Sequence, residues 1–263
     1  WGKSFMTKII IDSTSDLPKQ LTEEYGIDML PLRVHLEDKE YLDKVNITVE
    51  EVYDAMRKGI YPKTSLPNPK ETYELFKNYA SRGIDFIYYS FSSKLSSTYQ
   101  TCKLIIEELK NQFPSVKMEV LDTKAGSFAS GLISMQGAIL SKLGIDFEEV
   151  VEVSKENIRN IEHVFTIDDL DCLLQGGRIS KGSAIAGNIL NIKPILDVED
   201  GNIILIDKVR GRKKALKTVA DLVEDRIRKF TDQVVGIVHA DDLKAALNVK
   251  NMLQERLKIE NIL

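Results

Sequence analysis

The chain has 263 residues, and its 36 basic and 40 acidic side chains leave a net charge of −4 at pH 7. A chain of this length favours two domains and a sizeable core. The acidic balance excludes a general electrostatic attraction to nucleic acid or to an anionic membrane surface, so neither is an expected partner.

In the first half of the chain, strand-like apolar runs alternate with helix-like segments. The predicted strands are residues 8–11, 29–36, 84–91 and 117–121, and helices are predicted after Asp16, from Thr48, from Pro69, over 97–111 and after the last strand. Such alternation indicates a mainly parallel sheet with helices on both faces. Because ligand groups gather at the carboxyl ends of such strands, we expect the segments 12–16 (DSTSD), 90–97 (SFSSKLSS) and 122–131 (DTKAGSFASG) to share one rim.

From about residue 153 the pattern changes to that of an α+β domain. The predicted strands are residues 163–167, 193–198 and 202–209, and amphipathic helices are predicted from about Gly211 and over 241–257. Asp200 and Gly201 supply a tight hairpin turn between the last two strands. We therefore predict an N-terminal α/β domain over residues 6–152 and a C-terminal α+β domain over residues 153–263.

Two hydroxyl-rich segments, TSLPNP at 64–69 and SFSSKLSSTYQ at 90–100, offer several donors without a strong base. Clustered hydroxyls favour holding an oxyanion over cleaving a bond. Ser96, Ser97 and Thr98 stand at a predicted helix start, where unpaired backbone N–H groups point outward and attract anions. The alternative is that these residues are ordinary helix caps.

The sequence carries no P-loop, dinucleotide-binding glycine motif, HExxH or GxSxG pattern. His35, His163 and His239 lie on separate predicted strands without a second ligand at metal spacing, so we expect no metal site. Asp12 and Asp122 end predicted strands and could pair as acid and base. Aspartate is equally the usual turn-forming residue at such positions.

Cys102 and Cys172 lack a CxxC or other ligand spacing, so neither a structural disulfide nor a zinc site is expected. No apolar stretch approaches the ~20 residues that span a bilayer. The start of the chain also lacks the basic segment and apolar core of a secretory signal. The composition therefore favours a soluble protein of the reducing cytoplasm, without stable membrane insertion.

Two basic features remain. The segment QGGRISKG at 175–182 presents Arg178 beside a glycine pair, which would let a guanidinium reach a carboxylate or phosphate. The glycines could instead simply end the preceding helix. The segment KVRGRKKALK at 208–217 gathers cations at a predicted helix start, where they are unfavourable, so a partner's acidic surface competes with simple solvation as the explanation.

Taken together, the motifs IIIDSTSDLP, TSLPNP, SSKLSSTYQ, DTKAGSFASGL, LQGGRISKG and RGRKKA resemble the DegV family, in order from residue 8 to about residue 217. Its members include the fatty-acid-binding subunit (FakB) of bacterial fatty acid kinase. The resemblance implies a two-domain fold, with a parallel-sheet domain followed by an α+β domain and a long-chain fatty acid between them. It also implies a bacterial, non-catalytic protein of phospholipid metabolism with no cofactor of its own.

The same resemblance implies roles for individual residues. Thr64 and Ser96 would donate hydrogen bonds to the lipid carboxylate, and Arg178 would help to organise that site. Ser97 stands where the family usually has glycine, so its extra hydroxyl is a secondary candidate. Arg210 would dock an ATP-dependent fatty acid kinase subunit, which supplies the metal and the phosphoryl-transfer machinery. A Gly-rich segment with a carboxylate-binding histidine, usual in the family, does not occur before Leu263.

An acyl chain needs an apolar lining. Burial of some fourteen methylenes would contribute about 11 kcal/mol before the costs of association, so affinity would come from the tail. Small residues in AGSFASGLIS (125–134) leave room on a helix face. The candidate lining residues are Phe128, Leu132, Ile133, Ile185, Ile189 and Leu190, for which ordinary core packing is the alternative.

We therefore predict a carrier that binds a long-chain fatty acid between two domains and presents its carboxylate to a separate kinase subunit for conversion to acyl phosphate. One alternative is an enzyme that acts on a small anionic metabolite, with Asp12 or Asp122 as base and Arg178 as anion clamp. Another is a regulatory lipid sensor that binds the same acid but signals to a different protein.

Overall fold

The structure is a computed structural model that describes residues 6–168, 170–179, 191–227, 233–257 and 262–263. The chain divides into two compact units, one ending at Ile161 and the other beginning at Glu162. This division follows helix α6 (Phe147–Asn160), whereas the predicted boundary between residues 152 and 153 lies within that helix. The amphipathic pattern of α6 therefore belongs to the first unit.

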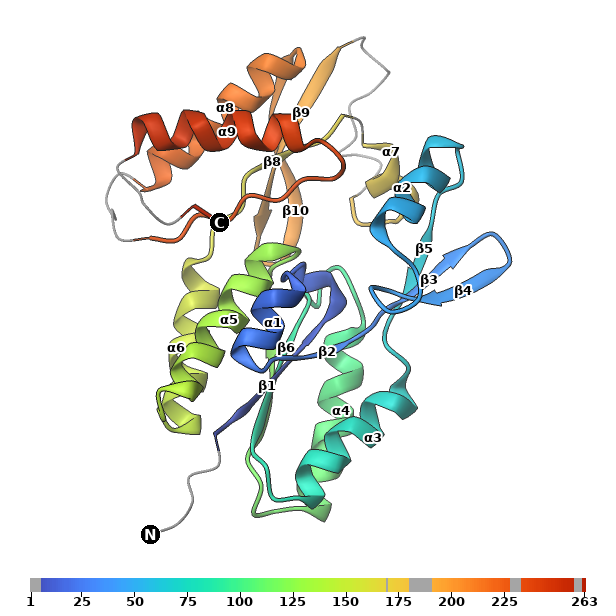
Figure 1. Cartoon of the computed structure of the whole chain (residues 1–263), viewed down its shortest axis with the longest axis vertical. Helices are drawn as coiled ribbons and strands as arrows, with labels where there is room; N and C mark the ends of the chain where they lie inside the picture. The colour runs from blue at the N-terminus through green and yellow to red at the C-terminus, as the bar shows by residue number, and fades with distance from the viewer. Residues whose placement is uncertain (1–5, 169, 180–190, 228–232, 258–261) are drawn as a thin grey trace. The chain divides into compact units, whose positions relative to one another are not determined.

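The first unit is built on a parallel sheet, sheet A, with the strand order β2-β1-β6-β7 (Figure 1). Its strands are β1 (Lys8–Asp12), β2 (Asp28–Leu30), β6 (Phe86–Ser90) and β7 (Met118–Asp122). Helices cover both faces: α1 (Lys19–Tyr25), α5 (Phe128–Lys142) and α6 on one, and α3 (Pro69–Ser81) and α4 (Thr98–Gln112) on the other. The predicted α/β class is confirmed.

The side chains of sheet A point alternately to its two faces, so the core of this unit has two layers. In β1, Ile9 and Ile11 join the core beneath α5 and α6, whereas Ile10 between them joins the core beneath α3 and α4. Successive side chains of a strand point to opposite faces, so a strand covered on both faces must be apolar throughout. The unbroken runs III of β1 and FIYY of β6, which precede the polar last residue of each strand, satisfy this requirement.

A second, antiparallel sheet interrupts the parallel pattern of the first unit. Its strands, in the order β4-β3-β5, are β3 (Arg33–Leu36), β4 (Lys39–Leu42) and β5 (Lys63–Ser65), and α2 (Val49–Arg57) lies between β4 and β5 in the chain. The single strand predicted over 29–36 is wrong, because the chain leaves sheet A at Pro31 and pairs again from Arg33. Proline has no N–H for the sheet and marks such exits.

The second unit is an α+β structure, as predicted. Its antiparallel sheet has the order β10-β9-β8, with β8 (Phe165–Thr166), β9 (Ile192–Glu199) and β10 (Asn202–Arg210). Its helices are α7 (Asp171–Gln175), α8 (Arg212–Ile227) and α9 (Leu243–Arg256). Asp200 and Gly201 both have positive φ, 45° and 81°, which confirms the predicted tight turn.

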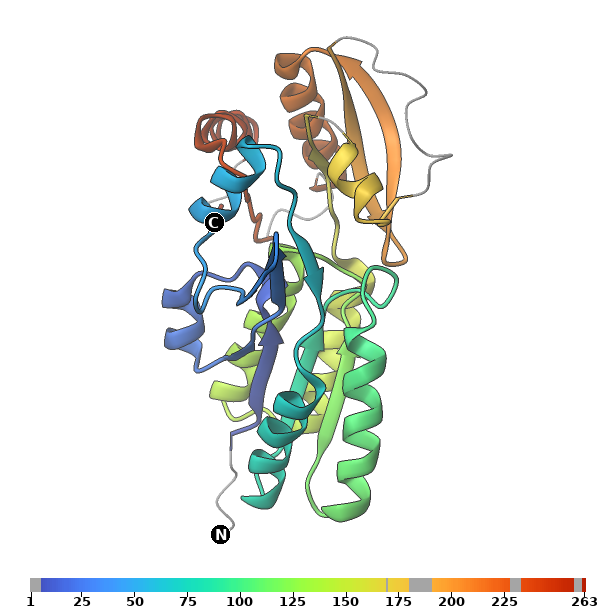
Figure 2. The ribbon, with the colours of Figure 1, turned by 90° about the vertical axis from the view of Figure 1, so that its right-hand side faces the viewer.

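Helices α8 and α9 lie side by side (Figure 2). The apolar faces predicted from the sequence share one core cluster, which includes Leu216, Ala220, Val249 and Leu253. The strand expected to end at His239 is reduced to an isolated bridge between Val235 and Ile262. Within the described ranges, no helix is both long and apolar enough to cross a bilayer.

Candidate functional site

The strand order of sheet A locates a candidate site. After β2 the chain crosses to the other side of β1, so the order reverses between β1 and β6. In parallel α/β sheets, ligands bind outside the carboxyl ends of the strands at such a reversal. Three loops leave the sheet at this rim, namely residues 13–18 after β1, residues 91–97 after β6, here called the hydroxyl loop, and residues 123–127 after β7.

Asp12, the last residue of β1, joins two of these loops across the reversal point. One carboxylate oxygen accepts hydrogen bonds from the backbone N–H (3.1 Å) and the hydroxyl of Thr14, and the other accepts from the Tyr88 hydroxyl and the Phe91 backbone N–H, both at 3.0 Å. The residue is 1% exposed. Burial raises the pKa of Asp12, and its four hydrogen bonds oppose that rise.

Asp122, the last residue of β7, braces the hydroxyl loop from the other side. It accepts from the backbone N–H of Ser93 (3.0 Å), the Ser93 hydroxyl and the backbone N–H of Lys124 (3.1 Å). The third loop also reaches the first, since the Ser127 hydroxyl donates to Asp16 at 2.7 Å. The prediction that the three loops share one rim is confirmed.

The hydroxyl loop uses much of its own hydrogen-bonding capacity. The Ser96 N–H donates to the Ser92 carbonyl (3.1 Å), and the Thr98 N–H donates to the Ser96 hydroxyl (3.3 Å), which also contacts the Thr98 hydroxyl at 2.8 Å. Ser96 thus accepts a hydrogen bond at the start of α4, although the N-cap residue itself is Ser97. The N–H groups of Ser96 and Thr98 are paired within the protein, whereas the sequence predicted that they would be unpaired. Ser97 is exposed, and its side chain makes no capping bond.

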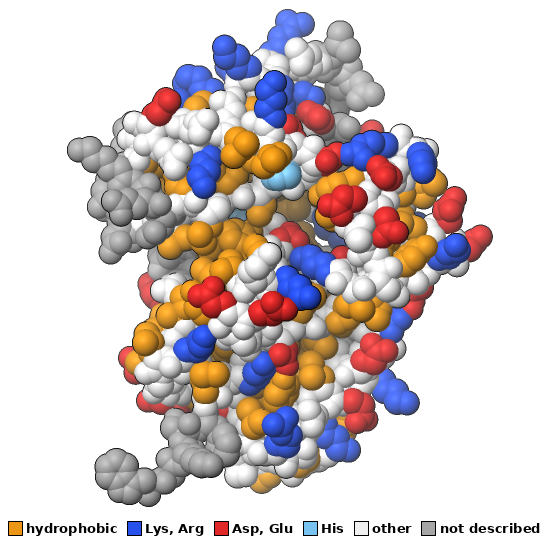
Figure 3. Space-filling view, in the orientation of Figure 1, with side chains coloured by type: hydrophobic (Ala, Val, Ile, Leu, Met, Phe, Trp, Pro, Cys, Tyr) orange, Lys and Arg blue, Asp and Glu red, His pale blue; other side chains and the backbone are white. Residues whose placement is uncertain are grey.

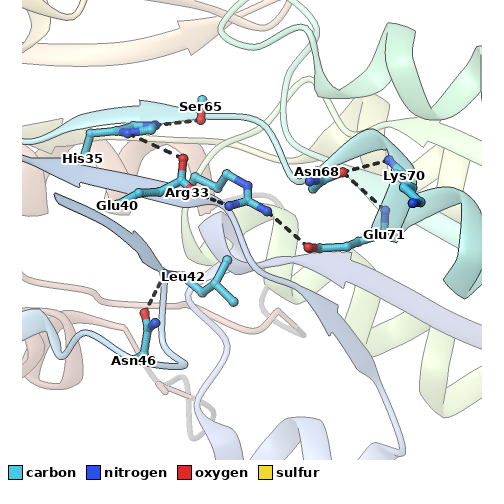
Figure 4. A network of polar contacts seen from close by, with 9 residues as sticks. All are labelled: Arg33, His35, Glu40, Leu42, Asn46, Ser65, Asn68, Lys70 and Glu71. Atoms are coloured by element: carbon cyan, nitrogen blue, oxygen red, sulfur yellow. Dashed lines mark hydrogen bonds and ion pairs between the residues drawn. The ribbon is translucent and has the colours of Figure 1, made fainter. Parts of the chain in front are cut away.

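The other hydroxyl-rich segment joins the small sheet to α3 (Figure 4). Ser65 bonds His35 at 3.0 Å, and Asn68 caps α3 by accepting from the backbone of Lys70 at 2.9 Å. Thr64 lies within β5 and not in a loop, is exposed, and points to the face opposite Ser65 because strand side chains alternate. Glu71 anchors the start of α3 to Arg33 at 3.2 Å.

Arg178 and Arg210 belong to the second unit. The expected role of Arg178 beside Thr64 and Ser96, and that of Arg210 in docking a kinase subunit, stay predictions. Gly177 ends α7 with a φ of 71°, as the alternative interpretation expected, and the Arg178 guanidinium donates to the Gly176 carbonyl. Arg210 is exposed at the end of β10. Figure 3 shows Lys and Arg side chains gathered over the part of this unit that carries α8. The exposed basic residues at the end of β10 and on α8 are Lys208, Arg210, Lys213, Lys214 and Lys217.

The candidate lining residues in the first unit belong to its core. Phe128 and Ile133 are 6% and 2% exposed, and Leu132 packs against the same cluster. The expected room beside the small residues of α5 is filled, because a Cβ on Gly131 would lie 2.6 Å from the Ser15 carbonyl oxygen. The small residues of α5 therefore allow this helix to lie close to its neighbours. The remaining candidates, Ile185, Ile189 and Leu190, lie outside the described residues.

The sequence did not indicate the role of Lys44, which joins the rim from the segment between β4 and α2. Its ammonium group donates to the Ser13 carbonyl (2.6 Å) and to Asp16 (3.0 Å). Asp16, Lys44 and Ser127 all have a positive φ, of 51°, 61° and 51°. Such conformations cost non-glycine residues free energy and persist where surrounding contacts hold them. A lysine 28 residues from its partner has no local sequence signal.

Two comparisons with known sequences match nearly the whole chain. A family model described as "Uncharacterised protein, DegV family" matches residues 6–263. A DegV domain-containing protein of Clostridium perfringens is 35% identical over 263 residues, which cover 98% of this chain and 90% of the relative.

Solved structures also match nearly the whole chain. A DegV family protein of Ruminococcus gnavus with vaccenic acid has a TM-score of 0.88 at 27% identity, and a stearic acid-binding protein of Eubacterium ventriosum has 0.87 at 25%. Each comparison covers 98% of this chain and 92% of the other.

Proposed function

The chain belongs to the DegV family, and from this premise we propose that it binds a long-chain fatty acid and presents the carboxylate to a separate kinase subunit. Similar structures from Eubacterium ventriosum and Ruminococcus gnavus are described with stearic acid and with vaccenic acid. The sheet order supports a ligand site at the same rim that carries the hydroxyl loop.

The start of α4 is the observation that carries the proposal. Ser96 and Ser97 precede a helix of 15 residues whose amino-terminal dipole favours an anion. A carboxylate that leaves water needs donors in place of its hydration. The Ser97 hydroxyl is exposed, and we propose it as one of these donors. Thr64 and Arg178 complete the proposed head-group set, with Phe128, Leu132 and Ile133 as proposed lining for the tail.

The two carboxylates of the rim favour a carrier over an enzyme. Asp12 is buried and accepts four hydrogen bonds from the protein, and Asp122 accepts three. A general base must reach the proton that it removes. Neither carboxylate is free to remove a proton from a ligand while it accepts these hydrogen bonds. We therefore propose that phosphoryl transfer takes place on the partner. Arg210, exposed among other cations, is the proposed contact with that subunit.

Mass spectrometry of lipid extracted from the purified protein tests the binding proposal. We expect a fatty acid at close to one per chain, and its absence would count decisively against the proposal. The double variant Thr64→Ala, Ser96→Ala should bind the acid at least about tenfold more weakly, since each hydrogen bond to a charged group contributes roughly 1.5–3 kcal/mol. Ser81→Ala, an exposed hydroxyl on α3, is the matched control.

The kinase step needs its own experiment. Arg210→Ala should retain fatty acid binding but lower the rate at which an added fatty acid kinase forms acyl phosphate. Lys39→Ala, which removes an exposed cation on the other unit, should leave that rate unchanged. A normal rate with Arg210→Ala would refute the docking role, and binding without any phosphorylation would favour the lipid sensor.

A further inference from the structure

We propose that Asp12 and Asp122 are positioning residues, which fix the hydroxyl loop in its binding conformation before a fatty acid arrives. This inference rests on the proposed function. The two carboxylates end the strands on either side of β6, and each accepts a backbone N–H from the loop that follows it. Carboxylates close to an anion site weaken binding by repulsion, so their place at this rim needs another explanation.

The backbone of the hydroxyl loop is bonded at every residue from 91 to 96. The N–H groups of Phe91 and Ser93 donate to the two aspartates, and that of Ser92 donates to the Ala125 carbonyl at 3.0 Å. The remaining N–H groups, at residues 94–96, all donate to Ser92. The loop is thereby ordered up to the start of α4, so a ligand would not have to order it and affinity would rise accordingly.

The two aspartates differ in a way that allows a sharp test. One oxygen of Asp12 accepts the backbone N–H of Thr14, and the other accepts the backbone N–H of Phe91. Neither N–H group can rotate toward another acceptor. An asparagine has one oxygen and must point its NH₂ group at one of them. In Asp122 a single oxygen accepts both backbone N–H groups, and the other accepts only the Ser93 hydroxyl, which can rotate. Asparagine can therefore replace Asp122 but not Asp12.

The experiment compares the affinities of the full chain for hexadecanoic acid and for hexadecan-1-ol, because only the acid requires the carboxylate donors. We expect Asp12→Asn to lower the acid-to-alcohol affinity ratio by about tenfold, because the loss of one well-placed hydrogen bond to a charged group has an effect of this size. Asp122→Asn keeps the loop bonds and removes a nearby negative charge, so its ratio should rise by about twofold. Asp122→Ala loses the bonds and should lower the ratio.

Electrostatics alone predicts a different pattern, since all three substitutions remove one negative charge and should all raise the ratio. An unchanged or raised ratio in Asp122→Ala would overturn the inference, whatever the result for Asp12→Asn. Asp122 is only partly buried, so its two variants decide the question even where Asp12→Asn folds poorly. A wild-type protein that does not prefer the acid would overturn the proposed function itself, which separates the two failures.

Discussion

Gly137 in α5 has no space for even one added methyl group. A Cβ at this position would lie 2.0 Å from the hydroxyl oxygen of Tyr89 and 2.9 Å from its ring. Tyr89 is 2% exposed and bonds Ser154 of α6 at 2.6 Å, so it is enclosed by the core. Gly137→Ala must therefore displace α5 or break the bond between Tyr89 and Ser154.

The expected loss of stability follows from three opposing effects. Alanine favours the helix over glycine by roughly 1 kcal/mol. Overpacking a core costs about 1–3 kcal/mol, and a buried hydroxyl without a partner costs about as much again. The net loss is about 3 kcal/mol, which corresponds to a fall in Tm of about 6–12 °C for a unit of this size.

Thermal unfolding followed by circular dichroism measures this loss, and a double-mutant cycle identifies its cause. In a Tyr89→Phe background the 2.0 Å contact disappears, so Gly137→Ala should cost clearly less there than in the wild type. A Gly137→Ala variant as stable as the wild type would refute the packing argument. Equal costs in the two backgrounds would show that the Tyr89 hydroxyl is not the obstacle.

Two further predictions concern Cys102 and Asn68. Burial raises the pKa of Cys102 to about 12, so in a Cys172→Ser background its thiol should resist alkylation at pH 8 until urea unfolds the protein, and rapid labelling of the native state would contradict this. Asn68→Ala should cost about 1 kcal/mol in urea unfolding, because Asn68 caps α3. Asn78→Ala, an exposed position within the same helix, should cost nothing, and equal losses would show that the cap is unimportant.

The sequence predicted the parallel sheet because its strands are covered on both faces and read as unbroken apolar runs. It also located the hairpin turn, since Asp200 and Gly201 both need positive φ. The small sheet was missed because β3, β4 and β5 have only three or four residues each. Runs of this length carry too few side chains for a clear alternation.

The candidate site, like the fold, was predictable from the sequence only in part. The shared rim was predictable, because the carboxyl ends of parallel strands lie on one edge of the sheet. The hydrogen bonds of Asp12 to Tyr88 and Phe91 were not, because they join residues 76 and 79 positions apart. Sequence spacing reports on neighbours within one element, whereas these contacts depend on the pairing of whole strands.

Residues 31–68 lie between β2 and α3 and form no part of sheet A, so a change there has different consequences from a change at the rim of that sheet. Asp12, Asp122 and the hydroxyl loop are anchored in the parallel sheet, where a change would disturb the core. Thr64 stands on the small antiparallel sheet, which enters the chain between β2 and α3 and could change in length or shape without re-pairing any strand of sheet A. Under the proposed function, a change in this small sheet would alter the contact of Thr64 with the acid and leave the loops of sheet A unchanged.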